Sequence, residues 1–336
     1  QRQLILPRAN QGDCRLADGR LVALAHLRDV IRWLQHPEQR SQLLPQSRPA
    51  VPDAADPDGS EQRPGSEPVV GQQQAKRALA LAAAGGHHLL MIGPPGTGKS
   101  LLARTFQSLL PDLDAHAEME LAAIYSVAGL PRSGSTPPFR DPHQSVSTTA
   151  MVGGGRTPGP GEISLAHGGV LFLDELPHFK PSVLDSLREP LETGRITIVR
   201  ANWQAEFPAR FQLLTAMNPC PAGMVCNDQD CRCRPDQVQR YQARVSGPLL
   251  DRIDLHVPVP EVPVDTLLDP DPALLAQPFD RTDIAAARTL QTQRQGMLNC
   301  QLHGEKLQQI CGLGNDERRL LTLAAQRYQL SADFIG

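Results

Sequence analysis

A short glycine-rich segment in the first third of the chain constrains the fold more than any other feature. It matches the pattern G-x-x-x-x-G-K-[ST] and consists of Gly93, Pro94, Pro95, Gly96, Thr97, Gly98, Lys99 and Ser100. The apolar run 88–92 before it predicts a buried strand, and residues 101–110 after it are typical of a helix. This order of strand, loop and helix predicts a phosphate-binding loop rather than an ordinary glycine-rich turn.

The chemistry of such a loop assigns a role to its parts. The glycines let backbone N–H groups converge on phosphate oxygens at the positive N-terminus of the following helix. Lys99 is expected to meet the β- and γ-phosphates, and the Ser100 hydroxyl is expected to bind Mg²⁺. The lysine is informative because only four of the 33 basic residues are lysines. We therefore expect ATP and Mg²⁺ as cofactors, with Gly93 to Leu101 as the nucleotide-contacting segment.

Two further apolar runs of strand length end at polar residues. Residues 170–173 are followed by Asp174 and Glu175, and residues 211–216 are soon followed by Asn218. In a parallel α/β sheet, these side chains gather at the carboxyl edge beside the phosphate loop. We expect Asp174 to hold Mg²⁺ through water, Glu175 to activate the attacking water, and Asn218 to orient that water and sense the γ-phosphate. Taken alone, Asp174 and Glu175 also fit a solvated acidic turn after a strand. Asn218 alone also fits an asparagine that starts a turn before proline.

Composition and periodicity divide the chain into several parts. The expected parts are residues 1–44, 45–68, 69–262, 263–280 and 281–336. The first contains apolar residues at helix spacing from Leu24 to Leu34 and is too short to form a domain. The second and fourth are proline-rich linkers, the third is the α/β core, and the fifth is a small helical domain.

Charge and hydropathy exclude several classes of protein. The 336 residues carry a formal net charge of −3 and 40% hydrophobic residues, which suits a chain with a substantial buried core. No run of about eighteen apolar residues occurs, and the first residues lack the pattern of a signal peptide. We expect a cytoplasmic protein without a membrane partner. Because the net charge is near zero, any contact with DNA must be local.

Four of the seven cysteines lie in a short polar segment that follows Asn218. They are Cys220, Cys226, Cys231 and Cys233. Four thiolates can satisfy tetrahedral Zn²⁺, but this spacing lacks the paired C-x-x-C pattern of a zinc knuckle. The sequence leaves structural zinc and reduced thiols as two open interpretations.

Several motifs together resemble those of known ATPases. GPPGTGKS, VLFLDE, AMNP and GPLLDRIDLHV are similar to motifs of AAA+ ATPases in the magnesium-chelatase and helicase branch. More closely, PFRDPHQSVSTTAMVGGGRTPGPGEISLAHGGVLFLDE and PARFQLLTAMNPCPAG resemble the ComM (YifB) competence family of magnesium-chelatase-like proteins, and the resemblance extends over about residues 1–332. It implies an α/β AAA+ P-loop fold with a central parallel sheet flanked by helices. It further implies a hexameric, ATP-driven ring that acts as a DNA helicase and promotes branch migration in recombination during natural transformation.

The resemblance also assigns roles to two residues of the core. It makes Asn218 the sensor 1 residue and Arg252 the arginine finger, which reaches the nucleotide of a neighbouring subunit. A guanidinium in that position stabilises charge in the transition state of phosphoryl transfer. The alternative for Arg252 is a surface ion pair with Asp251 or Asp254.

Two segments are candidates for contact with DNA. Residues 151–162 are rich in glycine, and the resemblance implies an insert in the second helix that projects toward the ring pore and carries Arg156. Residues 195–200 and 203–207 alternate like a hairpin around Ala201-Asn202, and the family has a pre-sensor hairpin here with Arg195 and Arg200. These arginines are expected to meet phosphates of single-stranded or branched DNA without regard to base sequence. A flexible loop and solvated strand residues are the alternatives.

The ends of the chain depart from the family pattern. The resemblance implies that residues 1–44 are the end of an N-terminal domain with a Lon-like S5 fold. It also implies a partial C-terminal lid, because Asp333 stands where the family continues into its sensor 2 helix. Two other functions therefore stay open. One is a magnesium-chelatase-type ATPase subunit that remodels a partner protein, and the other is a nucleotide-binding subunit without turnover.

Overall fold

The computed structural model describes residues 4–7, 21–24, 26–36, 68–132, 134–155, 159–200, 203–223, 233–276 and 278–328. Contacts between backbone positions divide the chain into two compact units. The smaller unit comprises Gln1–Arg63 and Leu113–Ser135, and the larger comprises Pro64–Asp112 and Thr136–Gly336. All the candidate catalytic residues belong to the larger unit.

The smaller unit is built from short elements. Its described elements are β1 (Leu4–Pro7), β2 (Leu21–Leu24), α1 (Leu27–Gln35) and α5 (Ala115–Val127). Strands β1 and β2 are parallel, and Val22, Leu24 and Trp33 form a small buried cluster. The helix expected from Leu24 begins instead at Leu27. Leu24 is the last residue of β2, where its side chain packs in this cluster. Helix α5 begins after Asp114, whose carboxylate accepts a hydrogen bond from the backbone N–H of Ala117.

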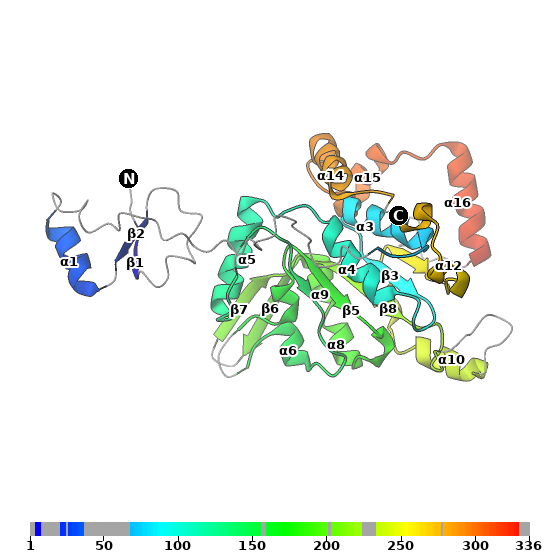
Figure 1. The fold of residues 1–336 in the computed structure, drawn as a ribbon, viewed down its shortest axis with the longest axis horizontal. Helices are drawn as coiled ribbons and strands as arrows, with labels where there is room; N and C mark the ends of the chain where they lie inside the picture. Colours follow the sequence, from blue (N-terminus) through cyan, green and yellow to red (C-terminus); the bar gives the residue numbers. More distant parts are fainter. Residues whose placement is uncertain are drawn as a thin grey trace. The chain divides into compact units, whose positions relative to one another are not determined.

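The larger unit is organised around a five-stranded sheet in which every paired strand is parallel (Figure 1). The spatial order is β4 (Phe139–Arg140), β5 (Val170–Leu173), β8 (Gln212–Met217), β3 (Leu89–Ile92) and β9 (Leu255–Pro258). This confirms the predicted α/β fold with a central parallel sheet. Because the strands are parallel, their carboxyl ends share one edge, and β8 lies between β3 and β5.

Both faces of the central strands β5, β8 and β3 are buried, which explains why these strands are largely apolar runs. Their side chains alternate between two core clusters. In β5, for example, Val170 and Phe172 belong to one cluster, and Leu171 and Leu173 belong to the other. All four are almost completely inaccessible to solvent. Because both faces are apolar, the sequence of such a strand indicates where the strand lies in the chain. It does not indicate which side chains point to which face of the sheet.

Helices cover the sheet. Those of the core are α3 (Gln73–Gly85), α4 (Lys99–Leu109), α6 (Thr148–Val152), α7 (Glu162–Leu165), α8 (Pro181–Asp185), α9 (Arg188–Thr193), α10 (Pro235–Gln242) and α11 (Gly247–Leu250), with the 3₁₀ turn η3 (Leu176–His178). Apolar residues of α3 and α4 pack in one cluster, and those of η3, α8 and α10 pack in the other. Helix α3 forms because it is alanine-rich, and it ends at Gly86 in the left-handed conformation.

The predicted hairpin is present as a separate two-stranded antiparallel ribbon. It consists of β6 (Arg195–Arg200) and β7 (Trp203–Pro208), with Arg195 opposite Pro208. Ile196 and Ile198 are buried on its inner face. The hairpin expectation is confirmed, while its turn residues lie outside the described residues.

The C-terminal part of the larger unit is helical. Its elements are α12 (Val264–Leu268), α13 (Pro272–Leu275), α14 (Arg281–Gln295), η4 (Asn299–Gln301), α15 (Gly304–Ile310) and α16 (Asn315–Tyr328). Helix α14 docks on the end of α3, where carbonyl groups lack partners within the helix. The Arg288 Nε donates to the Ala83 carbonyl at 2.8 Å, and the Gln291 Nε2 donates to the Ala84 carbonyl at 3.0 Å. Polar side chains thus attach this helical part to the core.

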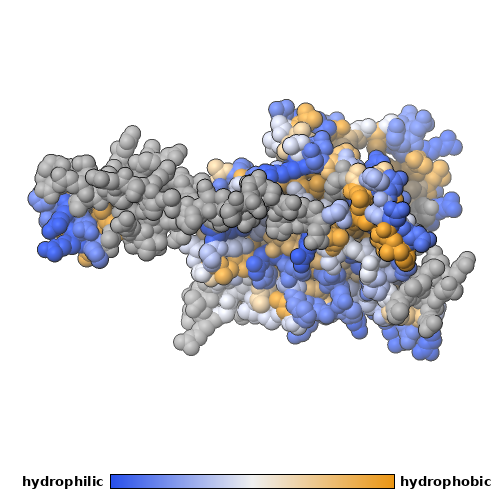
Figure 2. All heavy atoms as spheres, in the orientation of Figure 1, coloured by the Kyte–Doolittle hydropathy of each residue, from blue (hydrophilic) through white to orange (hydrophobic). Residues whose placement is uncertain are grey.

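Apolar side chains remain on the surface of this helical part. Val264 and Leu268 of α12 and Leu320 and Leu323 of α16 are exposed. Figure 2 shows hydrophobic residues among hydrophilic ones on the side where these helices lie. Across the described residues, no helix combines the length and apolarity that crossing a membrane requires.

Candidate functional site

The phosphate-loop sequence connects the end of β3 to the start of α4. Gly93 has no room for a side chain, because a Cβ atom there would lie 2.0 Å from the Val259 carbonyl oxygen. Gly96 and Gly98 have φ angles of 81° and 86°, in the left-handed region that favours glycine. This geometry turns the chain directly into the N-terminus of α4, where free N–H groups favour an anion.

Lys99 is the first residue of α4, and its side chain folds over the loop. Its Nζ donates to the carbonyl oxygens of Gly93 and Pro94 at 2.8 and 2.7 Å, and to the Asn218 Oδ1 at 3.2 Å. Only 7% of the residue is exposed. Burial lowers the pKa of the Lys99 ammonium, while the carboxylates of Asp174 and Glu175 oppose this shift. The structure therefore brings together the predicted lysine and the predicted amide.

The Ser100 hydroxyl donates to the Asp174 Oδ2 at 2.7 Å. These residues are 74 positions apart in the sequence, and the contact joins the start of α4 to the end of β5. A hydroxyl and a carboxylate oxygen are both ligand types that Mg²⁺ accepts. The two side chains thus lie together where the sequence predicts a magnesium site, and their chemistry fits that ion.

Glu175 follows Asp174 and takes an unusual backbone conformation. Its φ and ψ angles are 54° and 46°, which is the left-handed region and is costly for a residue with a side chain. Its N–H donates to the Asp174 Oδ1 at 2.9 Å, so the two adjacent acids are held in a tight turn. The Glu175 side chain is 51% exposed, and its Oε2 lies 3.3 Å from the His178 Nδ1.

Several residues that the sequence did not point to border this edge. Gln72 has a φ of 55°, and its Nε2 donates to the carbonyl oxygens of Pro260 at 2.6 Å and Thr97 at 3.4 Å. Asp141 follows β4, and its pKa is raised by burial and then by the carboxylate of Asp174. A two-residue strand carries no periodic signal, so Asp141 could not have been found from the pattern.

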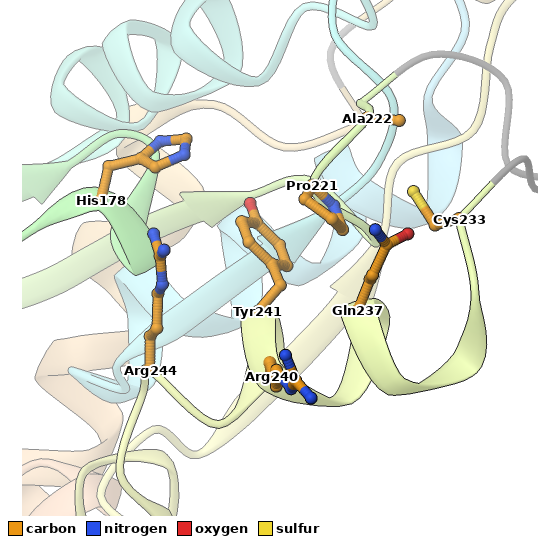
Figure 3. A pocket seen from close by; sticks show the side chains of 8 residues that line it. All are labelled: His178, Pro221, Ala222, Cys233, Gln237, Arg240, Tyr241 and Arg244. Atoms are coloured by element: carbon orange, nitrogen blue, oxygen red, sulfur yellow. The ribbon is translucent and has the colours of Figure 1, made fainter.

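Tyr241 on α10 is buried. Burial is the main cause of its raised pKa, and a hydrogen bond with the backbone of Asn218 opposes this shift. The rings of Tyr241 and His178 meet edge to face, with centroids 6.0 Å apart. Both residues line an open depression of about 660 Å³ together with Arg240 and Arg244 (Figure 3).

The predicted arginines differ in what the structure describes. Arg252 is 40% exposed, and its Nε and Nη2 donate to the Glu192 Oε1 at 3.0 and 2.7 Å. Arg195 donates to the Glu206 Oε1 of the facing strand at 2.6 Å. Arg200 is the last residue of β6, but its side chain is not among the parts that the structure describes. Arg156 lies outside the described residues, so the predictions for both arginines stay predictions.

The cysteine segment gives no support to the zinc prediction. Cys220 is buried and Cys233 is partly exposed, while Cys226 and Cys231 lie outside the described residues. Within the described part of the chain, no group of three or more His, Cys, Asp or Glu side chains is arranged to hold a metal ion. Among the described residues, Cys220 and Cys233 therefore belong to no cluster that could bind a metal ion.

Comparisons with known proteins cover nearly the whole chain. The family model for magnesium chelatase subunit ChlI matches residues 66–267, and the model for the C-terminal part of ChlI matches residues 280–333. The chain is 43% identical to the uncharacterized protein YifB of Escherichia coli over 322 residues, which is 94% of this chain and 61% of the relative. It is 40% identical to the competence protein ComM of Haemophilus influenzae over 335 residues, which is 98% of this chain and 65% of the relative.

A more distant match is the magnesium-chelatase 38 kDa subunit of Cereibacter sphaeroides. It is 26% identical over 204 residues, which is 52% of this chain and 55% of that protein. The chain thus spans between 50% and 65% of the length of the first curated relatives that it matches.

Proposed function

Because this chain belongs to the magnesium-chelatase-like family that includes YifB and ComM, we propose that it hydrolyses ATP within a ring of identical subunits and uses that reaction to move DNA. The ring is a hexamer, and its work is helicase activity that promotes branch migration during recombination in natural transformation. The competence name of the Haemophilus influenzae relative supports this choice of process.

One observation carries the ATPase proposal. The strand order sets the ends of β3, β8 and β5 side by side, and the contacts of Lys99 with Asn218 and of Ser100 with Asp174 join them. A cation, a hydroxyl–carboxylate pair, a second carboxylate and an amide thus lie at one sheet edge. Phosphoryl transfer to water needs this set of groups.

The residues act on bound ATP as follows. Lys99 exchanges its two carbonyl contacts for oxygens of the β- and γ-phosphates, with which an ammonium forms stronger, charge-assisted hydrogen bonds. Ser100 and Asp174 would hold Mg²⁺, which would neutralise charge on these phosphates. Glu175 accepts a proton from water as the water oxygen bonds to the γ-phosphorus and the bond to the β-phosphate oxygen breaks, leaving ADP and phosphate. Asn218 orients the attacking water.

A neighbouring subunit completes the site through Arg252. The ion pair with Glu192 holds the guanidinium within its own chain, and the pair is half-exposed. An exposed pair of this kind contributes little free energy, so exchange of the carboxylate for a neighbour's γ-phosphate is inexpensive. The exposed apolar residues of α12 and α16 offer further surface for contact between copies.

Contact with DNA is proposed for the β6–β7 hairpin and for Arg156 in the glycine-rich segment. Arg195 lies on the hairpin and is 61% exposed, with its charge shared with Glu206. Together with Arg200, it would bind phosphates and not bases. Such binding is independent of sequence and weakens as salt rises, because it releases counterions from the DNA.

A magnesium-chelatase-type ATPase is the second candidate. Both matching family models are named for a chelatase subunit, which favours it. Against it, identity to the chelatase subunit is 26% over 52% of the chain, compared with 40% over 98% for the competence protein. DNA dependence of turnover separates the two candidates.

The test is ATP turnover by the purified chain with and without forked DNA. We expect turnover that forked DNA stimulates and that Lys99→Ala abolishes. Turnover that is indifferent to DNA would favour the chelatase-type function. ATP binding without any turnover would contradict the ATPase proposal.

Mixing two inactive variants tests the shared site. In a mixed ring, an Arg252→Ala subunit keeps an intact phosphate loop and receives Arg252 from a Lys99→Ala neighbour. We expect the mixture to regain part of the turnover that each variant lacks alone. A mixture as inactive as its components, at concentrations where rings form, would mean that Arg252 does not act across subunits.

A further inference from the structure

His178 and Glu175 are held together by one turn of backbone. The His178 N–H donates to the Glu175 carbonyl at 2.8 Å and closes the η3 turn. Pro177 lies within this turn, and its ring restricts the backbone further. As a result, the His178 Nδ1 lies 3.3 Å from the Glu175 Oε2. A carboxylate can only accept hydrogen bonds, so the Nδ1 carries the hydrogen and donates it.

The other side of the imidazole packs against Tyr241. The two rings meet edge to face at 6.0 Å between centroids, with an angle of 64° between their planes. Tyr241 is 4% exposed, so its ring is a fixed surface against which His178 is placed. A hydrogen bond with the backbone of Asn218 opposes the rise that burial causes in the pKa of Tyr241, which places this residue beside Asn218. Contacts therefore lead from Glu175 through His178 to Tyr241.

No sequence motif assigns a role to His178, and the ATPase mechanism above does not use it. The residue is 37% exposed and lines the open depression in Figure 3, so it is not itself part of the buried core. Glu175 is 51% exposed, and a carboxylate on a long, exposed side chain has several rotamers available. A hydrogen-bond donor at its Oε2 removes most of that freedom.

We propose that His178 is a positioning residue for Glu175: its Nδ1–H holds the Oε2, so that the Oε1 remains available to accept the proton of the attacking water. Tyr241 packs against the imidazole and also contacts the backbone of Asn218. It therefore holds the Glu175 carboxylate and the Asn218 amide in fixed positions relative to each other. This inference rests on the proposed function, in which Glu175 is the general base. Misplacement of a reacting group by about 1 Å can cost on the order of a hundredfold in rate.

Substitutions at position 178 test the inference in the full chain. His178→Asn places an amide nitrogen near the position of the Nδ1, His178→Gln places one near that of the Nε2, and His178→Leu removes both. We expect His178→Leu to lower kcat for ATP hydrolysis by about tenfold, with KM changed less than about twofold. We expect His178→Asn to recover most of the lost kcat and His178→Gln to recover little. Circular dichroism and binding of a fluorescent ATP analogue serve as controls for folding and for the nucleotide site.

Glu175→Gln separates failure of the inference from failure of the proposed function. If Glu175→Gln abolishes turnover while His178→Leu leaves kcat unchanged or raises it, His178 does not position the base. Equal recovery by Asn and Gln would also overturn the role of the Nδ1. If Glu175→Gln keeps full turnover, or if the unaltered chain has none, the proposed function itself fails and the inference fails with it.

Discussion

His88 gives the strand that carries the phosphate loop a specific sensitivity to acid. It precedes β3, and its Nδ1 accepts a hydrogen bond from the backbone N–H of Leu213 at 3.0 Å, so this nitrogen is unprotonated in the folded chain. Burial lowers the pKa of His88 to about 4, although the carboxylate of Asp254 opposes the shift. Protonation would break the bond to Leu213 and place a charge in an enclosed site.

The sign and size of the effect follow from the two pKa values. An unfolded histidine has a pKa of about 6.5, so between pH 6.5 and pH 4 the unfolded chain binds a proton that the folded chain does not. The contribution of neutral His88 to the free energy of unfolding is therefore fully present above this window. It is lost as pH decreases through the window. The loss between pH 7 and pH 5 is about 2 kcal/mol. This is an upper limit, because part of the residue reaches solvent.

His88→Asn removes the titration but keeps an acceptor for the Leu213 N–H. We expect the free energy of unfolding of the unaltered chain to fall by up to about 2 kcal/mol more than that of the variant between pH 7 and pH 5. Urea denaturation followed by circular dichroism at both pH values measures this difference. Burial raises the pKa of Asp254, but hydrogen bonds from His87 and the His88 backbone outweigh it and lower this pKa in the folded chain, so the carboxylate stays ionised between pH 7 and pH 5. Equal losses in the two proteins would show that protonation of His88 is not the cause of the acid sensitivity.

Three further substitutions probe the magnesium site, the hairpin and the attachment of α14. Ser100→Ala should lower kcat at least about tenfold and raise the Mg²⁺ concentration for half-maximal turnover, because it removes the hydroxyl ligand that lies beside Asp174. An unchanged Mg²⁺ titration would contradict this. Arg195→Ala should leave ATP turnover without DNA intact but weaken DNA binding. It should also reduce the slope of log affinity against log salt by about one unit, measured by fluorescence anisotropy, and an unchanged slope would exclude a phosphate contact. Arg288→Met should lower the free energy of unfolding in urea by about 2 kcal/mol, because the Ala83 carbonyl and the Gln212 Oε1 lose a charged donor; a loss below about 0.5 kcal/mol would count against it.

The sequence predicted those parts of the fold that local chemistry determines. The phosphate loop needs glycines at left-handed positions before a helix, and Gly96 and Gly98 meet that need. Strands buried on both faces must be continuous apolar runs, which located β3, β5 and β8 to within one residue at each end. The order β3-β8-β5 also agrees with the expectation that Asp174, Glu175 and Asn218 gather at the sheet edge beside the phosphate loop.

What the sequence did not predict depends on contacts between distant residues. Strand β4 has two residues and forms only because it pairs with β5, so Asp141 had no periodic signal. His178 reads as an ordinary turn residue until Tyr241, 63 positions later, is placed against it. The Glu192 partner of Arg252 is likewise 60 positions away, whereas the sequence suggested only its neighbours Asp251 and Asp254. Partners of this kind are set by tertiary packing and not by spacing along the chain.

In the proposed function, ATP hydrolysis at this sheet edge drives movement of branched DNA. The most direct measurement follows the separation of a labelled four-way DNA junction by the purified chain with ATP. We expect ATP-dependent separation that Glu175→Gln abolishes while junction binding is retained. Separation that proceeds equally well with a non-hydrolysable ATP analogue, or in the Glu175→Gln variant, would contradict the claim.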